Sequence, residues 1–334
     1  MPVGRVWLTA LLVFVTSLGA IETLARARGY DPMVRDTREL WCYHRERASK
    51  AGRNALVLIG ASRMQNGMVP EVLGCQFPDN EVAMLALSGH DTRAILDNLA
   101  ADETFTGTII CSMTALWLEG EYFWQTLTPY IDYYEHDWSL GVRLSTRVHM
   151  RLQERLALLH EGFSFAAFQD RLSGKSYQNF TYSRASRFRE VHWAKAEDLM
   201  RKKARANAIY RDTFETKPFP APDEMLERYA RVERTVQQLH AKGCRVVFVR
   251  LPSSGEVWEL EQQYTPKHLY WDRFAELTQA ETYHFKDFTA LRDFECSDNT
   301  HLDYGDAVLF TRAFVDVLRE HGEENGERAT GQQD

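Results

Sequence analysis

Five short apolar runs constrain the fold of this 334-residue chain more than any other feature. They are Ala55 to Gly60, Val82 to Gly89, Thr108 to Ser112, Cys244 to Pro252 and Tyr283 to Phe288. The first and fourth are continuous hydrophobic stretches, which is typical of strands in a parallel sheet that is covered on both faces. The runs therefore predict a buried parallel sheet of five strands.

Helical patterns lie between these runs. Between Pro222 and Gly243, apolar residues at helical spacing predict one buried face, made by Met225, Leu226, Tyr229, Val232, Val236 and Leu239. Gly243 is well placed to cap this helix, and the fourth run follows at once. A final amphipathic helix is predicted from about Gly305 to Glu320. Strands that alternate with helices predict an α/β fold.

The third and fourth runs lie about 130 residues apart, far more than one connecting helix needs. We therefore expect an α/β domain over residues 29–322 with a helical insertion at about 120–220, and a charged, disordered tail over 323–334. The insertion is rich in aromatic and basic side chains. Its basic run could touch an anionic glycan or lipid headgroups, but a solvated helix face with acidic partners is the favoured reading.

Residues 1–28 form a separate N-terminal segment. No charged residue occurs from Val6 to Ile21, and Arg5 precedes this stretch. Sixteen residues is shorter than the roughly 20 that span a bilayer. An uncleaved membrane anchor is favoured over a cleaved signal peptide, and a buried helix of a soluble protein is the third reading. Arg5 favours a cytoplasmic N-terminus with the domain outside the membrane, although Arg26 and Arg28 weaken that orientation.

Composition excludes some classes of protein. The chain is 44% hydrophobic with a net charge of -7, which argues against both wholesale disorder and nucleic-acid binding. The absence of a C-x-x-C pair argues against a zinc or thioredoxin-type site. We expect Cys111 and Cys244 to be core thiols, whereas Cys42, Cys75 and Cys296 flank predicted loops, where an exported domain could form one disulfide.

A serine follows the first predicted strand in the stretch LVLIGASRMQNG. Ligands bind beyond the carboxyl ends of strands in open α/β sheets, so Ser62 stands in the right place for a nucleophile. Gly60 permits a tight exit from the strand, and Ser62 could open the next helix, where backbone N–H groups are available to an oxyanion. A serine at such a turn is also a common helix cap.

The stretch CSDNTHLDYGDA places Asp298 and His301 three positions apart, just before the last helix. This spacing lets one turn deliver a base together with the carboxylate that orients it, provided that a nucleophile lies nearby. The second predicted strand ends in LALSGHD, where Gly89 can bring its backbone N–H close to a ligand. A capping aspartate with an unrelated histidine is the alternative reading of the pair.

The order Gly-x-Ser-Arg, Ser-Gly and Asp-x-x-His-Leu along the chain resembles the SGNH (GDSL-like) hydrolase superfamily, over about residues 53–120 and 243–320. The resemblance implies a flavodoxin-like three-layer α/β/α sandwich. It also implies Ser62 as nucleophile, His301 as general base and Asp298 as the carboxylate that orients it. The amides of Ser62 and Gly89 would donate to the oxyanion.

One departure concerns the third block of that superfamily, which supplies an asparagine to the oxyanion hole. The corresponding stretch, CSMTALWLEGEYFW, contains no asparagine, and Thr114 could donate its hydroxyl instead. Loss of one oxyanion donor costs on the order of 10²–10³ in rate. Arg63, Arg250 and Glu256 also lie near predicted strand ends, where they would either bind substrate or form ion pairs.

The N-terminal segment together with this domain resembles, in architecture, the acyl-transfer proteins that modify cell-envelope polymers such as alginate or teichoic acid. The resemblance implies a serine esterase or O-acyltransferase of the periplasm or cell surface, without metal or cofactor. Its substrate would be an acylated glycan or small ester, and its partner a membrane-bound acyltransferase. The alternative is a non-catalytic subunit that binds glycan or assembles a membrane complex.

Overall fold

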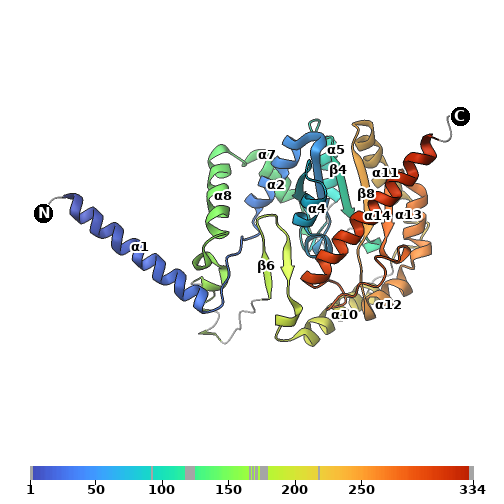
Figure 1. The fold of residues 1–334 in the computed structure, drawn as a ribbon. Coiled ribbons are helices and arrows are strands. Elements are labelled where there is room, and N and C mark those ends of the chain that lie inside the picture. The colour runs from blue at the N-terminus through green and yellow to red at the C-terminus, as the bar shows by residue number, and fades with distance from the viewer. Residues whose placement is uncertain are drawn as a thin grey trace.

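The computed structural model describes residues 3–91, 93–116, 125–164, 167, 169, 172–173, 180–216 and 219–330. Its centre is a five-stranded sheet in the order β2-β1-β4-β8-β9 (Figure 1). The strands are β1 (Ala55–Ile59), β2 (Glu81–Met84), β4 (Thr108–Ser112), β8 (Arg245–Arg250) and β9 (Glu281–His284). All neighbouring strands pair in parallel, which confirms the predicted sheet.

Helices cover both faces of this sheet. The helices are α1 (Val3–Ala27), α2 (Arg38–Ala51), α3 (Ser62–Gly67), α4 (Pro70–Gln76), α5 (Arg93–Ala101), α7 (Thr128–His136), α8 (Leu140–Gln153), α10 (Leu199–Thr216), α11 (Leu226–Ala241), α12 (Gly255–Tyr264), α13 (Trp271–Leu277) and α14 (Tyr304–Thr330). Helices α2, α5, α11 and α13 pack on one face. Helices α3, α4 and α14 pack on the other.

Successive side chains of β1 point to opposite faces of the sheet, and both faces are covered, which explains why the strand is apolar throughout. Val57 and Ile59 are buried against the first group of helices, and Leu56 and Leu58 against the second. Each such side chain contributes about 1.5–3 kcal/mol by leaving water. Both cores therefore depend on the same short strand, and the end of β1 is held firmly from both sides.

Several predicted boundaries differ from the structure. The second apolar run forms a strand only to Met84, because the chain then turns across β1, where the Leu85 and Ala86 amides both donate to the Leu58 carbonyl. The α11 helix has the predicted buried face except at Leu226, which is 40% exposed in its first turn. Gly243 ends that unit with φ +82°, as the cap prediction requires.

The chain between β4 and β8 contains more than the predicted helices. Short strand β5 (Gln125–Thr126) pairs in parallel with β3 (His90–Asp91), which precedes β4. Strand β6 (Thr181–Ser183) pairs with β7 (Arg189–Val191) in an antiparallel hairpin. The hairpin could not be predicted from strands of three residues. Helix α10 packs against α12, so the insertion returns to the edge of the sheet where the carboxyl ends of the strands lie.

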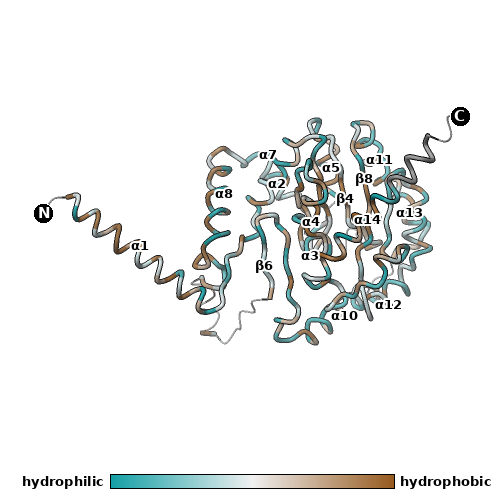
Figure 2. Tube along the Cα trace, viewed as in Figure 1, coloured by the Kyte–Doolittle hydropathy of each residue, from teal (hydrophilic) through white to brown (hydrophobic). Residues whose placement is uncertain are grey.

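Helix α1 projects from the body of the molecule, and apolar residues run along it (Figures 1 and 2). Among its described side chains only Ala25 is buried, which contradicts the reading of a buried soluble helix. Its 25 residues would extend about 37 Å, enough for the roughly 30 Å hydrocarbon core of a bilayer. By length and composition, α1 could be a membrane anchor or a signal sequence.

The predicted disorder of residues 323–334 stays a prediction. Helix α14 runs from Tyr304 to Thr330, and residues 331–334 lie outside the described part of the chain. Extending an existing helix fixes one residue for each hydrogen bond gained, whereas starting a helix is costly. A polar segment can therefore remain helical when it continues a docked helix.

The cysteine predictions are correct for the core thiols and wrong for two of the loop positions. Cys111 and Cys244 are buried and free. Cys42 lies inside α2 and Cys75 inside α4, and Cys296 is buried with its thiol 3.4 Å from the Pro252 carbonyl. All five cysteines are free thiols in the structure.

Gly60 is required by the turn between β1 and α3. Its φ is +152°, and an added Cβ would lie 2.7 Å from Met64 Cβ and 2.9 Å from Ser112 Cβ. We expect Gly60→Ala to lower the free energy of unfolding by about 2–4 kcal/mol through strain and overpacking, as measured by urea unfolding. Gly74→Ala in α4 is the control, because open space surrounds its Cβ and alanine favours the helix. Equal effects of the two changes would contradict this account of the turn.

Candidate active site

Ser62 lies at the carboxyl end of β1. The strand ends at Ile59, and Ser62 is the first residue of α3, as the sequence predicts. Strand β1 lies between β2 and β4, so its carboxyl end is in the interior of the sheet and not on an edge strand. The serine is therefore fixed by a buried strand on one side and a buried helix on the other.

The structure brings Ser62 and His301 together although 239 positions separate them. Ser62 Oγ lies 2.8 Å from His301 Nε2, and His301 Nδ1 lies 2.9 Å from Asp298 Oδ2. The predicted convergence is confirmed, with the serine–histidine distance inside the 2.6–3.2 Å range expected for a nucleophile and its base. In this arrangement the Ser62 hydroxyl can donate to Nε2 while Nδ1–H donates to the carboxylate.

Asp298 both orients the imidazole and caps its own turn. Its Oδ1 accepts from the Thr300 amide at 2.9 Å, the His301 amide at 2.7 Å and the Thr300 hydroxyl at 2.9 Å. Although burial raises the pKa of this carboxyl, His301 and the two amides outweigh burial and lower it to about 2. Asp298 therefore closes the turn and also contacts His301, which contradicts the reading of a capping aspartate with an unrelated histidine, while the catalytic role of the pair stays a prediction.

The low pKa of Asp298 predicts that the free energy of unfolding decreases at acidic pH. Its ordinary value is 3.8, and a group whose pKa is depressed by folding contributes stability that is complete above pH 4 and is lost as the pH falls toward 2. We expect the difference in unfolding free energy between the parent chain and Asp298→Asn to shrink by about 2 kcal/mol from pH 5 to pH 2 in urea titrations. A difference that does not change with pH would show that the carboxylate is not held in its charged form.

A cavity of about 440 Å³ opens onto Ser62 and His301. Its wall is lined by Ala61, Ser62, Arg63, Gly89, Ser112, Thr114, Leu116, Phe180, Trp193, Lys202, Arg205, Ala206, Ile209, Tyr210, Asp298, Thr300 and His301. Gly89 has φ +75°, and Thr114 follows β4, so both predicted oxyanion donors line the same cavity as the serine. Most of the lining surface is apolar, which suits an acyl chain or the face of a sugar ring.

The three predicted substrate-binding residues have different positions. Arg63 lines the cavity, but it is buried and bound to Glu261 Oε1 at 3.0 Å and to the Tyr210 hydroxyl at 2.8 Å. Arg250 is buried against the other oxygen of Glu261, and Glu256 forms an ion pair with Arg211 on α10. Arg250 and Glu256 are therefore structural ion-pair residues, the alternative that the sequence left open.

Glu261 is the most important residue that the sequence did not reveal. Its carboxylate joins Arg63 and Arg250, and all three side chains are more than 90% buried. Although burial raises the pKa of Glu261, the charges of Arg250 and Arg63 hold it below its ordinary value. Glu261 therefore stays charged, and it ties α12 and the end of β8 to the helix that begins with Ser62.

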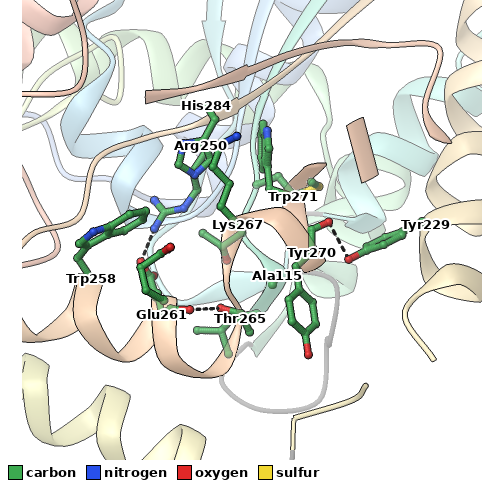
Figure 3. Close-up of a pocket in the computed structure, with 14 residues that line it drawn as sticks. Ala115, Tyr229, Arg250, Trp258, Glu261, Thr265, Lys267, Tyr270, Trp271 and His284 are labelled. Carbon is green, nitrogen blue, oxygen red and sulfur yellow. Dashed lines mark hydrogen bonds and ion pairs between the residues drawn. The ribbon is translucent and has the colours of Figure 1, made fainter. Parts of the chain in front are cut away.

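A second cavity of about 30 Å³ lies beside this ion-pair cluster. Arg250 and Glu261 point toward each other at its wall, with Trp258 and His284 around them (Figure 3). Burial, followed by the nearby positive charges, lowers the pKa of His284 to about 2, so this imidazole is neutral. The cavity is far too small to hold an ester substrate. It therefore belongs to the surroundings of the ion-pair cluster and not to a substrate site.

Helix α10 closes the main cavity from the side of the insertion. Tyr210, Ile209 and Lys202 come from this helix, and Lys202 Nζ lies 4.4 Å from the centre of the Phe180 ring. Part of the insertion therefore lies next to the serine, while the aromatic residues Tyr122, Phe123 and Trp124 lie outside the described part of the chain. The spacing of apolar residues along α10 could not show which part of the protein this helix would cover.

No protein-family model matches this chain, and no curated protein sequence matches it. The relationship to the SGNH superfamily therefore remains a proposal.

Proposed function

We propose that the chain is a serine esterase or O-acyltransferase that cleaves an acyl ester through Ser62, His301 and Asp298. The observation that carries the proposal is the unbroken chain of contacts from Ser62 Oγ to Nε2 at 2.8 Å and from Nδ1 to Asp298 at 2.9 Å. A histidine that bridges a serine and a buried carboxylate at the mouth of an apolar cavity is the arrangement of a nucleophile activated by a general base.

In the first half-reaction, His301 takes the proton of the Ser62 hydroxyl as Oγ bonds to the ester carbonyl carbon. The carbonyl oxygen becomes an oxyanion, which the amides of Ser62 and Gly89 and the Thr114 hydroxyl would bind, and all three residues line the cavity. The ester bond then breaks, and His301 returns the proton to the leaving alcohol. The product is an acyl-serine.

In the second half-reaction, water or a sugar hydroxyl attacks the acyl-serine. His301 removes the proton of the attacking oxygen, and Ser62 leaves and recovers that proton. Attack by water makes the protein an esterase, and attack by a sugar makes it an O-acyltransferase. Asp298 stays charged throughout, because its low pKa favours the carboxylate beside a positive imidazole.

The fold supports a place within the SGNH superfamily. Counted along the chain, the main sheet has the strand order 2-1-3-4-5, which is that of flavodoxin-like proteins with helices on both faces. The apolar helix α1 supports a location at the membrane with the domain outside the cytoplasm. An acylated cell-envelope glycan and a membrane-bound acyltransferase are the proposed substrate and partner.

The absence of an asparagine from the third block favours a second candidate, a non-catalytic glycan-binding or scaffolding subunit. An alkyl fluorophosphonate separates the two candidates, because it reacts only with an activated serine. We expect one adduct per chain, mapped to Ser62 by peptide mass spectrometry, together with release of acetate from a chromogenic acetyl ester. A chain that binds glycan but neither reacts nor hydrolyses would be the non-catalytic subunit. Adding an acceptor glycan distinguishes transfer from hydrolysis.

A further inference from the structure

Helix α8 carries a row of exposed apolar side chains that the proposed chemistry does not use. Leu140, Leu144, Val148 and Leu152 are 69%, 53%, 57% and 42% exposed, respectively. Their spacing of four residues aligns them along one side of the helix. Single exposed leucines are common on proteins, but a continuous apolar row marks a surface that binds something apolar.

Arginines accompany this apolar row. Arg147 and Arg151 are exposed, and because they follow Leu144 by three and seven positions they lie along one edge of the row. Helix α8 contains no aspartate or glutamate, although Arg151 pairs at 3.0 Å with Glu154 directly after the helix and the whole chain has a net charge of -7. A helix that combines an apolar row with arginines is typical of segments that lie on an anionic membrane surface.

The segment that follows α8 is fastened to the end of α1. The Glu22 carboxylate accepts from the Ala157 amide at 3.0 Å and from the Leu158 amide at 2.9 Å. Arg26 donates to the Arg155 carbonyl at 2.9 Å. A bilayer that holds α1 would therefore meet this part of the domain first.

The opposite side of α8 is already occupied. Met150 packs with Val34 and Leu40, and Thr146 is buried. The apolar row must therefore face away from the domain. In Figure 1, α8 is an outer helix on the side from which α1 departs.

We propose that α8 is an interfacial helix that lies against an anionic lipid bilayer, with its apolar row among the upper acyl chains and its arginines among the headgroups. The proposal rests on the proposed location of the domain at the membrane and does not depend on the serine chemistry. A bilayer satisfies both the apolar row and the arginines. With α1 it would hold the domain at two points, so the domain could not rotate freely about its tether.

Fluorescence quenching by lipid tests this proposal with the full-length chain. Cys75 is the one exposed cysteine and is replaced by serine, since the other four are buried and unreactive. Single cysteines are then introduced by Val148→Cys on α8, Leu309→Cys on α14 and Val13→Cys on α1, and each is labelled with an environment-sensitive probe. Leu309 is the matched control, because it is 54% exposed on a helix far from α1. Each protein is placed in nanodiscs of phosphatidylcholine and phosphatidylglycerol that carry a shallow nitroxide lipid.

We expect quenching at position 148 to be at least about threefold stronger than at position 309, and to weaken when phosphatidylglycerol is omitted or when Arg147→Gln and Arg151→Gln are combined. Quenching at position 13 without quenching at position 148 would overturn the proposal and leave the anchor in place. Absence of quenching at both positions would overturn the membrane location as well. Protection of the probe at position 148 from quenching only in native membranes would show that a protein covers the surface instead. Cross-linking between the position-148 cysteines of two chains would show the same.

Discussion

Replacing Ser62 with alanine is expected to abolish acyl-ester cleavage, with a loss of kcat on the order of 10⁶-fold. In the proposed mechanism this hydroxyl forms the acyl intermediate, and His301 Nε2, 2.8 Å away, is the base that takes its proton. Circular dichroism and thermal unfolding should stay close to those of the parent chain, because the hydroxyl is only partly buried. Steady-state hydrolysis of an acetyl ester gives the measurement.

Two matched variants sharpen this result. Ser112→Ala removes another serine of the same cavity that has no contact with His301, and it should keep fluorophosphonate labelling. Asp298→Asn should reduce kcat by no more than about 10⁴-fold, because it disturbs the tautomer of the base and leaves the nucleophile in place. Labelling that survives Ser62→Ala, or disappears in Ser112→Ala, would remove Ser62 from the proposed role.

Replacing Glu261 with alanine is expected to lower the free energy of unfolding by about 3–5 kcal/mol. The change leaves the guanidinium groups of Arg63 and Arg250 buried next to each other without their shared carboxylate. Chemical denaturation monitored by tryptophan fluorescence measures the loss. Because Arg63 follows the nucleophile directly, esterase activity should fall at temperatures where the chain is still folded.

Glu256→Ala is the control for that experiment. Glu256 lies on the same helix and is paired with Arg211, but their side chains are 33% and 51% exposed. A pair in contact with water contributes about 1 kcal/mol or less, so this variant should unfold close to the parent chain. Similar decreases in unfolding free energy for the two variants would show that burial of the Glu261 ion pairs does not determine the effect of breaking them.

The triad could be predicted from sequence because the order of a parallel sheet dictates where its loops meet. Ser62 follows the first strand and His301 follows the last, and each carries a local signature within four residues. Glu261 carries no such signature. Its partners lie 198 and 11 positions away, and a glutamate in an amphipathic helix ordinarily faces water. Only the packing of α12 on the sheet buries it.

Boundaries failed where tertiary contacts override local pattern. The apolar run after Met84 looks like strand, yet it leaves the sheet to place Gly89 at the cavity. Cys42 lies in a stretch rich in charged residues, yet α2 buries it in the core. The position of α10 over the site escaped prediction for a related reason, because it depends on contacts with α12 that no local spacing records.

The sequence separation of 239 positions between Ser62 and His301 also determines when the site forms during folding. Closing so long a loop is slow and entropically costly, and β9 must join β8 before the Asp298 turn has a surface to rest on. A growing chain, or one threaded through an export channel, carries a serine with no base beside it. Under the proposed function, activation of Ser62 would thus be tied to completion of the fold, and an immature chain would not acylate itself.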